Sequence, residues 1–218
     1  ASCLVGSEMC IRDRHRADDL LPQAIYGLPE HSAEKIKAAN LVAVPGCYPT
    51  ASILGLLPVI PYLQKNSKII LDAKSGISGA GKSSVENGLE EDIKENFKSY
   101  NVGFHRHQPE IKDFLKTEFN LDHEIIFIPH LLPLFRGEYV TLYCEVSQND
   151  LDLNELYESY YEKHKLVRVK EKGEIAEIKE VINTFYCDIS VSYAFQSNTI
   201  VVNSAIDNLL KGAASQAI

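Results

Sequence analysis

The spacing of apolar residues along the 218-residue chain predicts a mixture of helices and strands. Short apolar runs predict strands at residues 41–44, 67–73, 125–128, 139–146, 166–169, 187–195 and 199–203. Helical spacing predicts helices at residues 32–39, 48–63, 109–118 and 151–164, and a last helix beginning near Asp207. Several neighbouring strands are close enough for antiparallel pairing. The pattern therefore predicts an α+β fold, with a mixed, largely antiparallel sheet and helices on one face.

Individual residues refine the ends of these helices. Ser32 is expected to cap the first helix, because its hydroxyl can accept a hydrogen bond from a free backbone N–H group. Pro49 suits the first turn of the second helix, where an N–H group has no helical partner. Pro58 and Pro61 are expected to split or end that helix, because proline removes a hydrogen bond and clashes with the preceding turn.

Composition limits the classes of function. The chain is 45% hydrophobic and 24% charged, which is ordinary for a globular protein. Its formal net charge of -8 argues against nucleic acid or an anionic membrane as the main partner. No apolar run approaches the roughly 18 residues that a membrane-spanning helix needs. We therefore expect neither nucleic acid nor a membrane as a partner.

The cysteines and histidines do not indicate a metal site or a disulfide framework. Five cysteines are present, widely spaced and without a CxxC pair, and the seven histidines include no HExxH pattern. Cys144 and Cys187 fall inside apolar strands, so we expect them in the core. Reduced thiols in a cytoplasmic compartment fit this pattern best, and no metal is expected.

Cys47 is the strongest candidate for chemistry. It follows Pro45 and Gly46 at a predicted turn and stands directly before a predicted helix. The partial positive charge of a helix N-terminus stabilises a thiolate, and free backbone N–H groups can stabilise an oxyanion. An acyl-transfer nucleophile needs both of these. A buried structural cysteine in a strand-to-helix turn would fit the same pattern.

His105 and His107 form the second candidate. In an extended segment they would point to the same side, just before a predicted helix. Histidine is the usual general acid or base near neutral pH. The alternative is that both side chains only cap or solvate the start of the helix.

A glycine-rich loop is the third candidate. Residues 76–83 match the P-loop pattern GxxxxGK(S/T) and follow a predicted strand. Successive N–H groups in such a loop can bind an anion. A P-loop must lead directly into a helix, however, and residues 83–88 show little apolar periodicity. A nucleotide site, a substrate loop and a plain surface loop all remain open from these residues alone.

Eight segments together resemble the N-acetyl-γ-glutamyl-phosphate reductase family, in that family's order. They are residues 24–30, 45–50, 75–81, 105–111, 129–133, 136–137, 186–189 and 205–214. The segment at Cys47 reads PGCYPT and the segment at His105 reads HRHQPEI. The likeness extends from about residue 24 to the last residue, which makes it far more specific than any single motif. The resemblance implies that the loop at residues 76–83 is similar to that family's substrate-site loop and is not a P-loop.

The resemblance implies a fold and a reaction. The fold would be that of the C-terminal catalytic domain of glyceraldehyde-3-phosphate dehydrogenase. The reaction would be NADPH-dependent reduction of N-acetyl-γ-glutamyl phosphate to N-acetyl-glutamate 5-semialdehyde and phosphate in arginine biosynthesis, through a thioester on Cys47. The partners implied are this small acyl phosphate, NADP(H) and further copies of the chain in a homo-oligomer.

The resemblance also implies roles for individual residues. His105 would be the acid or base, with His107 the next choice. Substrate contacts would come from the loop residues Ser75, Gly76, Ser78 and Gly79. Asn208 and Gly212 match the segment that approaches the nicotinamide.

The expected organisation has four parts. Residues 1–14 resemble a translated sequencing adapter, so we expect them to be non-native and to contact little else. Residues 15–46 would be the end of the NADP-binding domain and the crossover. Residues 47–203 would form the catalytic and dimerisation domain, and residues 204–218 a truncated helix that returns to the NADP-binding domain. No GxGxxG fingerprint is present, so the chain alone is expected to be inactive.

Three alternatives to this function stay open. A sister reductase of carrier-bound aminoadipyl phosphate in lysine biosynthesis would share the same chemistry. A P-loop nucleotide binder would use residues 76–83. A cysteine hydrolase or an interaction module would use Cys47 without a cofactor.

Overall fold

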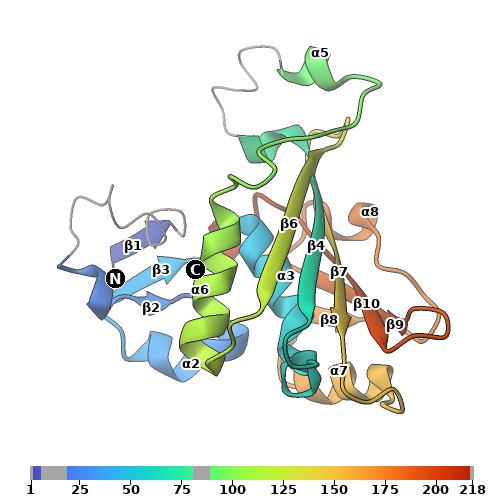
Figure 1. Ribbon diagram of the computed structural model, residues 1–218. Helices are drawn as coiled ribbons and strands as arrows, with labels where there is room; N and C mark the ends of the chain where they lie inside the picture. The colour runs from blue at the N-terminus through green and yellow to red at the C-terminus, as the bar shows by residue number, and fades with distance from the viewer. Residues whose placement is uncertain (1, 6–18, 81–88, 217–218) are drawn as a thin grey trace.

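The computed structural model describes residues 2–5, 19–80 and 89–216, with the backbone alone for residues 2–5 and Leu21. Its main feature is a seven-stranded sheet in the order β5-β6-β4-β7-β10-β9-β8 (Figure 1). The strands are β4 (Lys68–Ser75), β5 (Lys98–Ser99), β6 (Glu124–Leu131), β7 (Glu138–Glu145), β8 (Val167–Val169), β9 (Cys187–Tyr193) and β10 (Thr199–Ile206). The pairs β4–β6 and β8–β9 are parallel, and the other neighbours are antiparallel. The predicted mixed, largely antiparallel sheet is confirmed.

Three helices cover one face of this sheet. They are α3 (Cys47–Leu56), α6 (His107–Phe119) and α7 (Leu153–Tyr161). Leu54 of α3 is fully buried in one hydrophobic core with Leu142 of β7 and Val202 of β10. The short helix α8 (Ile178–Val181) instead packs near Tyr139 and Ala205, which point to the opposite face because side chains alternate along a strand. Figure 1 shows α3 and α6 on one side of the sheet and α8 on the other.

A smaller parallel sheet precedes α3. Its order is β1-β3-β2, formed by β1 (Ser2–Val5), β3 (Leu41–Val44) and β2 (Ile25–Tyr26), with α2 (Pro29–Lys37) beside it. β1 pairs with β3 along its full length, from Ser2 opposite Leu41 to Val5 opposite Val44. The expectation that residues 1–14 contact little else is therefore wrong for residues 2–5, and the rest of that segment lies outside the described residues.

Proline explains where two helices begin and end. α2 begins at Pro29, so the prediction of Ser32 as its N-cap is wrong: Ser32 lies inside, at a kink with φ -121° and ψ 22°. Proline already has the φ angle of a first helical residue, so it starts the helix earlier than the serine would. The predicted split of the second helix is confirmed, because α3 gives way to the 3-10 helix η3 (Leu57–Tyr62), which contains Pro61.

The last predicted helix does not form as an α-helix. After Asp207 the chain makes successive turns and then the 3-10 helix η5 (Ala214–Gln216). The backbone N–H of Leu210 donates to the Asp207 carbonyl, and so does that of Gly212, instead of forming a regular i to i+4 ladder. The remaining short elements are η2 (Leu21–Gln23), η4 (Ile77–Ala80) and α5 (Leu89–Ile93).

Candidate active site

Cys47 is the first residue of α3, so the helix begins one residue earlier than the predicted start at Tyr48. Gly46 precedes it as an extended N-cap, and the Thr50 hydroxyl donates to the Gly46 carbonyl at 2.9 Å. Cys47 is partly exposed, whereas Cys144 and Cys187 are 1% and 0% exposed in the core. Among the three cysteines with described side chains, Cys47 is thus the one at a helix start, and it keeps a small exposed surface although most of its side chain is buried.

The two histidines pack against the turn that carries Cys47. The imidazole of His107 lies so close to Gly46 that a Cβ atom there would sit 2.4 Å from His107 Nε2. The Nδ1 atom of His105 accepts a hydrogen bond from the His107 N–H group at 3.2 Å. Burial, with a smaller effect of Arg106, lowers the pKa of His105 to about 4. Burial also holds the pKa of His107 well below its ordinary value, so both rings are neutral near pH 7.

Glu110, on α6, holds the same turn in place. One of its carboxylate oxygens accepts from the Gly46 N–H group at 3.0 Å and from the Tyr26 hydroxyl at 2.9 Å. Burial raises the pKa of Glu110 to about 7, although these two hydrogen bonds oppose the shift. Glu110 lies within the HRHQPEI motif, but its position in the sequence did not indicate this role.

Glu138 is the residue of the site that the sequence analysis missed. It begins β7, pairs across the sheet with Ser75 of β4, and is 0% exposed. Its charge raises the pKa of Cys47, but neither carboxylate oxygen has a hydrogen-bond partner among the described residues. Burial raises the pKa of Glu138 to about 8. Glu138 lies on the same strand face as the core residue Val140, but the predicted strand began at Tyr139 and so left Glu138 out.

The electrostatics around the thiol oppose the helix N-terminus. The backbone N–H of Tyr48 lowers the pKa of Cys47, as expected for a helix start. Burial and the neighbouring carboxylates of Glu138 and Glu110 outweigh it and hold the pKa of Cys47 well above its ordinary value. The helix start therefore does not by itself bring the pKa of Cys47 below its ordinary value.

The glycine-rich loop contributes side chains instead of free backbone groups. The N–H groups of residues 76–79 donate at 2.8 to 3.2 Å to the carbonyl oxygens of Gly137, Leu134, Phe135 and Gly76. A phosphate cradle needs such N–H groups to be free, so the described part of the loop does not form a P-loop. Residues 81–83 of that pattern lie outside the described residues. Gly79 lies against Ser75, where a Cβ atom would come within 2.7 Å of the hydroxyl oxygen.

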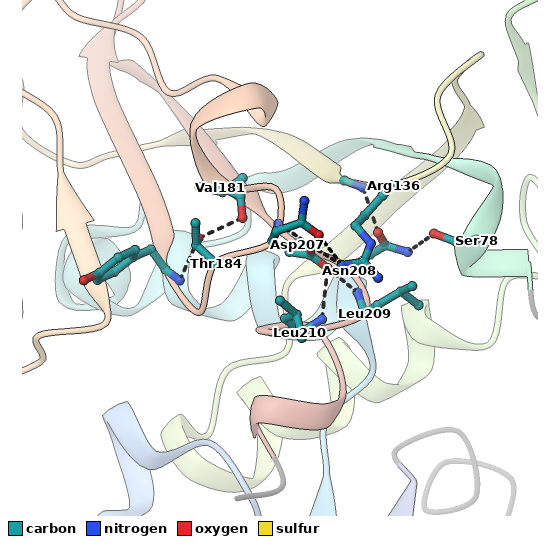
Figure 2. A network of polar contacts seen from close by, with 11 residues as sticks. Ser78, Arg136, Val181, Thr184, Asp207, Asn208, Leu209 and Leu210 are labelled. Carbon is teal, nitrogen blue, oxygen red and sulfur yellow. Dashed lines mark hydrogen bonds and ion pairs between the residues drawn. The ribbon is translucent and has the colours of Figure 1, made fainter.

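Asn208 and Gly212 join this loop to Cys47. Figure 2 shows Asn208 between the loop and the start of β7. Its carboxamide accepts from the Gly137 N–H group at 2.8 Å and donates to the Ser78 hydroxyl at 3.0 Å. Gly212 lies directly against the nucleophile candidate, since a Cβ atom there would sit 2.7 Å from the Cys47 Cβ atom.

The structure therefore brings the candidate residues together at one end of the sheet. Cys47 lies beside Glu138 and Gly212, His107 lies against Gly46, and Asn208 connects to the loop. Within the described residues no cluster of three or more His, Cys, Asp or Glu side chains could hold a metal ion. The helices of that part of the chain are also too short or too polar to cross a bilayer. A thiol beside a buried carboxylate and neutral imidazoles is suited to covalent acyl transfer.

The fold and the match to a family model together define the class of this domain. Residues 47–208 match the family described as semialdehyde dehydrogenase, dimerisation domain, and the chain belongs to this family. An aspartate semialdehyde dehydrogenase II from Vibrio cholerae has a similar fold, with a TM-score of 0.70 and 16% identity over 90% of this chain and 66% of that one. A probable aspartate-semialdehyde dehydrogenase from Pseudomonas aeruginosa has a TM-score of 0.71 and 15% sequence identity. The match covers 89% of this chain and 66% of that one.

Closer sequence relatives carry a more specific name. The N-acetyl-gamma-glutamyl-phosphate reductase of Desulforudis audaxviator is 44% identical over 97% of this chain and 62% of its own length. The protein of that name from Thiobacillus denitrificans is 45% identical over 94% of this chain and 60% of its own length. The chain thus spans about three fifths of the relatives that it matches, and the resemblance inferred from its motifs is confirmed.

Proposed function

We propose that this protein reduces N-acetyl-γ-glutamyl phosphate to N-acetyl-glutamate 5-semialdehyde and phosphate, with NADPH as reductant, in arginine biosynthesis. The observation that carries the proposal is Cys47 at the start of α3, with Glu138, His107 and Gly212 around it. The names of the relatives supply the substrate. A cytoplasmic location and a homo-oligomer fit such an enzyme, and the family description refers to dimerisation.

The reaction would proceed in two displacements at one carbon. Cys47 attacks the carbonyl carbon of the acyl phosphate. Phosphate departs, and the acyl group stays on the sulfur as a thioester. Splitting one difficult displacement into two steps is what covalent catalysis offers. His105 is assigned the acid or base role, with His107 as the next choice. Because both rings are neutral, they start as proton acceptors and not as donors.

The loop residues would position the substrate. The N–H groups of residues 76–79 are already hydrogen-bonded, so the contacts would come from hydroxyl groups. The Ser78 hydroxyl accepts from Asn208 and keeps its hydrogen for a ligand, whereas the buried Ser75 hydroxyl already donates to the Gly76 carbonyl at 2.9 Å and can only accept. Gly76 and Gly79 allow close packing: a Cβ atom at Gly76 would lie 2.8 Å from the Phe135 carbonyl oxygen. Substitutions at either glycine are therefore expected to displace the serines.

Part of the cofactor contact would also come from this chain. Gly212 fits this role because it has no side chain: a Cβ atom at this position would lie 2.7 Å from the Cys47 Cβ atom and would crowd the nucleophile. Asn208 fits less well, since its carboxamide already bonds to Gly137 and Ser78, which leaves one N–H for a ligand. NADPH, when bound, supplies the hydride that reduces the thioester carbonyl.

Two experiments separate this proposal from its alternatives. Full-length gene product should oxidise NADPH when given N-acetyl-γ-glutamyl phosphate and release one product aldehyde for each NADPH consumed. Turnover of carrier-bound aminoadipyl phosphate instead would assign the protein to lysine biosynthesis. Release of carboxylic acid without NADPH oxidation would support a cysteine hydrolase and contradict the proposal.

A further inference from the structure

A buried ion pair joins α2 to the segment that follows β10. The Lys211 ammonium donates to a Glu30 carboxylate oxygen at 2.5 Å, although 181 positions separate the two residues. The exposed fractions of the two side chains are only 3% and 5%. Taking two charges out of water is costly, so a buried pair is weak evidence of a contribution to stability alone. In some proteins a buried polar contact instead fixes one arrangement of the parts that it joins.

The two partners belong to parts of the chain that lie on different sheets. Glu30 lies in the first turn of α2, beside the small parallel sheet. Lys211 lies in the turns of residues 207–213, which follow β10 of the seven-stranded sheet. A second buried contact joins the same two parts, because the Gln216 side-chain amide donates to the Gly27 carbonyl at 3.4 Å. The turns after β10 are therefore bound to the segment around the small sheet.

The same turns are anchored to the seven-stranded sheet at their other end. Asp207 directly follows β10, and its carboxylate accepts from the Asn183 N–H group at 2.8 Å and from Arg136 at 3.3 Å. Lys211 lies four residues further along the chain. The segment that begins at Asp207 is thus fixed to one sheet by its first residue and to the other sheet by Lys211 and Gln216.

Between these two anchors the chain reaches the nucleophile candidate. Gly212 follows Lys211 directly, and a Cβ atom on Gly212 would lie 2.7 Å from the Cys47 Cβ atom. A displacement of about 1 Å beside a reacting centre can cost on the order of 10²-fold in rate. The place of Lys211 therefore decides how closely the backbone of Gly212 approaches the side chain of Cys47.

We propose that Glu30 and Lys211 are positioning residues, whose ion pair holds the Gly212 turn against Cys47. This inference rests on the proposed function, because Gly212 is the residue assigned there to the cofactor contact. Neither charged side chain takes part in a bond change. Within the described part of the chain Glu30 is the one carboxylate in ion-pair range of Lys211, whereas the positive end of α2 also favours the Glu30 charge. Loss of the Glu30 charge should therefore disturb the turn more than loss of the Lys211 charge.

Cysteine alkylation measures the position of the turn without substrate or cofactor. Full-length protein would be treated with iodoacetamide at one fixed pH, and the modified peptides quantified by mass spectrometry. Glu30→Gln leaves Lys211 buried beside a neutral amide, so the turn should move and Cys47 should react several-fold faster. Cys144 is 1% exposed in the core and should stay unmodified, which distinguishes a displaced turn from an unfolded protein.

NADPH kinetics measure the consequence for the reaction. In Glu30→Gln, kcat/KM for NADPH should fall by on the order of 10²-fold, because a displaced turn disturbs the approach of the nicotinamide. Phosphate release from N-acetyl-γ-glutamyl phosphate without NADPH should change far less, since the thioester forms before the cofactor acts. The double variant Glu30→Leu/Lys211→Met replaces the pair with packed apolar groups, which buried pairs often tolerate. It should regain most of the activity that Glu30→Gln loses.

A matched control and distinct failures complete the test. Glu34→Gln makes the same substitution on α2, in a pair with Lys37 that is exposed on both sides, and should leave alkylation and kinetics unchanged. Wild-type alkylation of Cys47 or wild-type NADPH kinetics in Glu30→Gln would overturn the inference, and so would joint modification of Cys47 and Cys144. Absence of NADPH oxidation by the wild type would overturn the proposed function, while the alkylation rates would still decide whether the pair holds the turn.

Discussion

Two polar clusters lie at the same end of the seven-stranded sheet, and they differ in how completely their groups are paired. The reactive cluster contains Cys47, His107, Glu110 and Glu138. The scaffold network contains Ser78, Arg136, Asn183, Asp207 and Asn208, and Figure 2 labels all of these except Asn183. Both clusters are built around a carboxylate with no exposed surface, Glu138 in the first and Asp207 in the second.

In the scaffold network the carboxylate is fully partnered. One oxygen of Asp207 accepts from the N–H groups of Leu209 and Leu210 at 2.9 and 3.0 Å. The other accepts from the Asn183 N–H group at 2.8 Å and from Arg136 at 3.3 Å. Such pairing offsets the cost of burying a charge, so this cluster stabilises the fold.

In the reactive cluster several buried polar atoms have no hydrogen-bond partner among the described residues. Both Glu138 oxygens, one Glu110 oxygen and the His107 Nδ1 atom have no regular hydrogen-bond partner among the described residues. Burial raises the pKa of Glu138 to about 8 and that of Glu110 to about 7. The comparison indicates that the paired groups of the scaffold network stabilise the fold, while the unpaired groups of the reactive cluster beside it are suited to chemistry.

The largest expected effect is on Cys47. In the full-length protein, Cys47→Ser should reduce NADPH-dependent turnover by at least about 10⁴-fold, as for loss of a covalent nucleophile. The midpoint of thermal unfolding should stay within a few degrees of the wild type, because Cys47 is not part of the scaffold network. Residual turnover above one hundredth of the wild-type rate would contradict its role.

The next effect concerns the histidines. His105→Asn should lower kcat by roughly 10² to 10⁴-fold, the usual range for a general acid or base, with a smaller change in KM. His164→Asn, in the segment after α7, is the matched control and should leave both constants unchanged. If His107→Asn lowers kcat and His105→Asn does not, the acid or base role belongs to His107.

Stability should respond to the scaffold network. Asp207→Ala removes the partner of four donors, so the free energy of unfolding should fall by about 3 kcal/mol in urea titration. The control is Asp152→Ala, which removes an exposed helix cap on α7 and should cost about 1 kcal/mol. Equal losses in the two variants would remove the distinction between the scaffold network and an ordinary surface cap.

The smallest effect is the pH dependence from Glu110. Its pKa rises from 4.5 in the unfolded chain to about 7 in the fold, so the folded state binds more protons between these values. That contribution is complete below pH 4.5 and is lost as the pH rises through 7, by an amount on the order of 1–3 kcal/mol. Glu110→Gln should flatten this part of the curve when unfolding is measured across that range. A curve parallel to the wild type would show that Glu110 titrates normally.

Periodicity predicted the elements of the fold well, because most strands and helices carry a regular apolar face. The wrong predictions concern helix ends, where a proline or a side chain bonded to the backbone decides the conformation. Pro29 began α2 ahead of Ser32, and side-chain bonding at Asp207 replaced the last helix with turns. Neither effect is visible in apolar spacing.

The candidate site was predicted where a local motif marks it, as at Cys47 and His107. Glu138 escaped because its effect depends on β4 and β10 beside it, and no local pattern records which residue a strand places next to a thiol. The loop at residues 76–79 was a wrong prediction of another kind. Its glycines suggested free N–H groups, but these groups already donate to backbone carbonyls of residues 76 and 134–137.

The most direct test of the central claim is to trap the acyl group on Cys47. Full-length protein would be mixed with N-acetyl-γ-glutamyl phosphate in the absence of NADPH, quenched in acid and digested for mass spectrometry. The account predicts an N-acetylglutamyl thioester on the peptide that contains Cys47, an equimolar release of phosphate, and loss of both in Cys47→Ser. Phosphate release that persists in Cys47→Ser, or an acyl group found only on another cysteine, would contradict it.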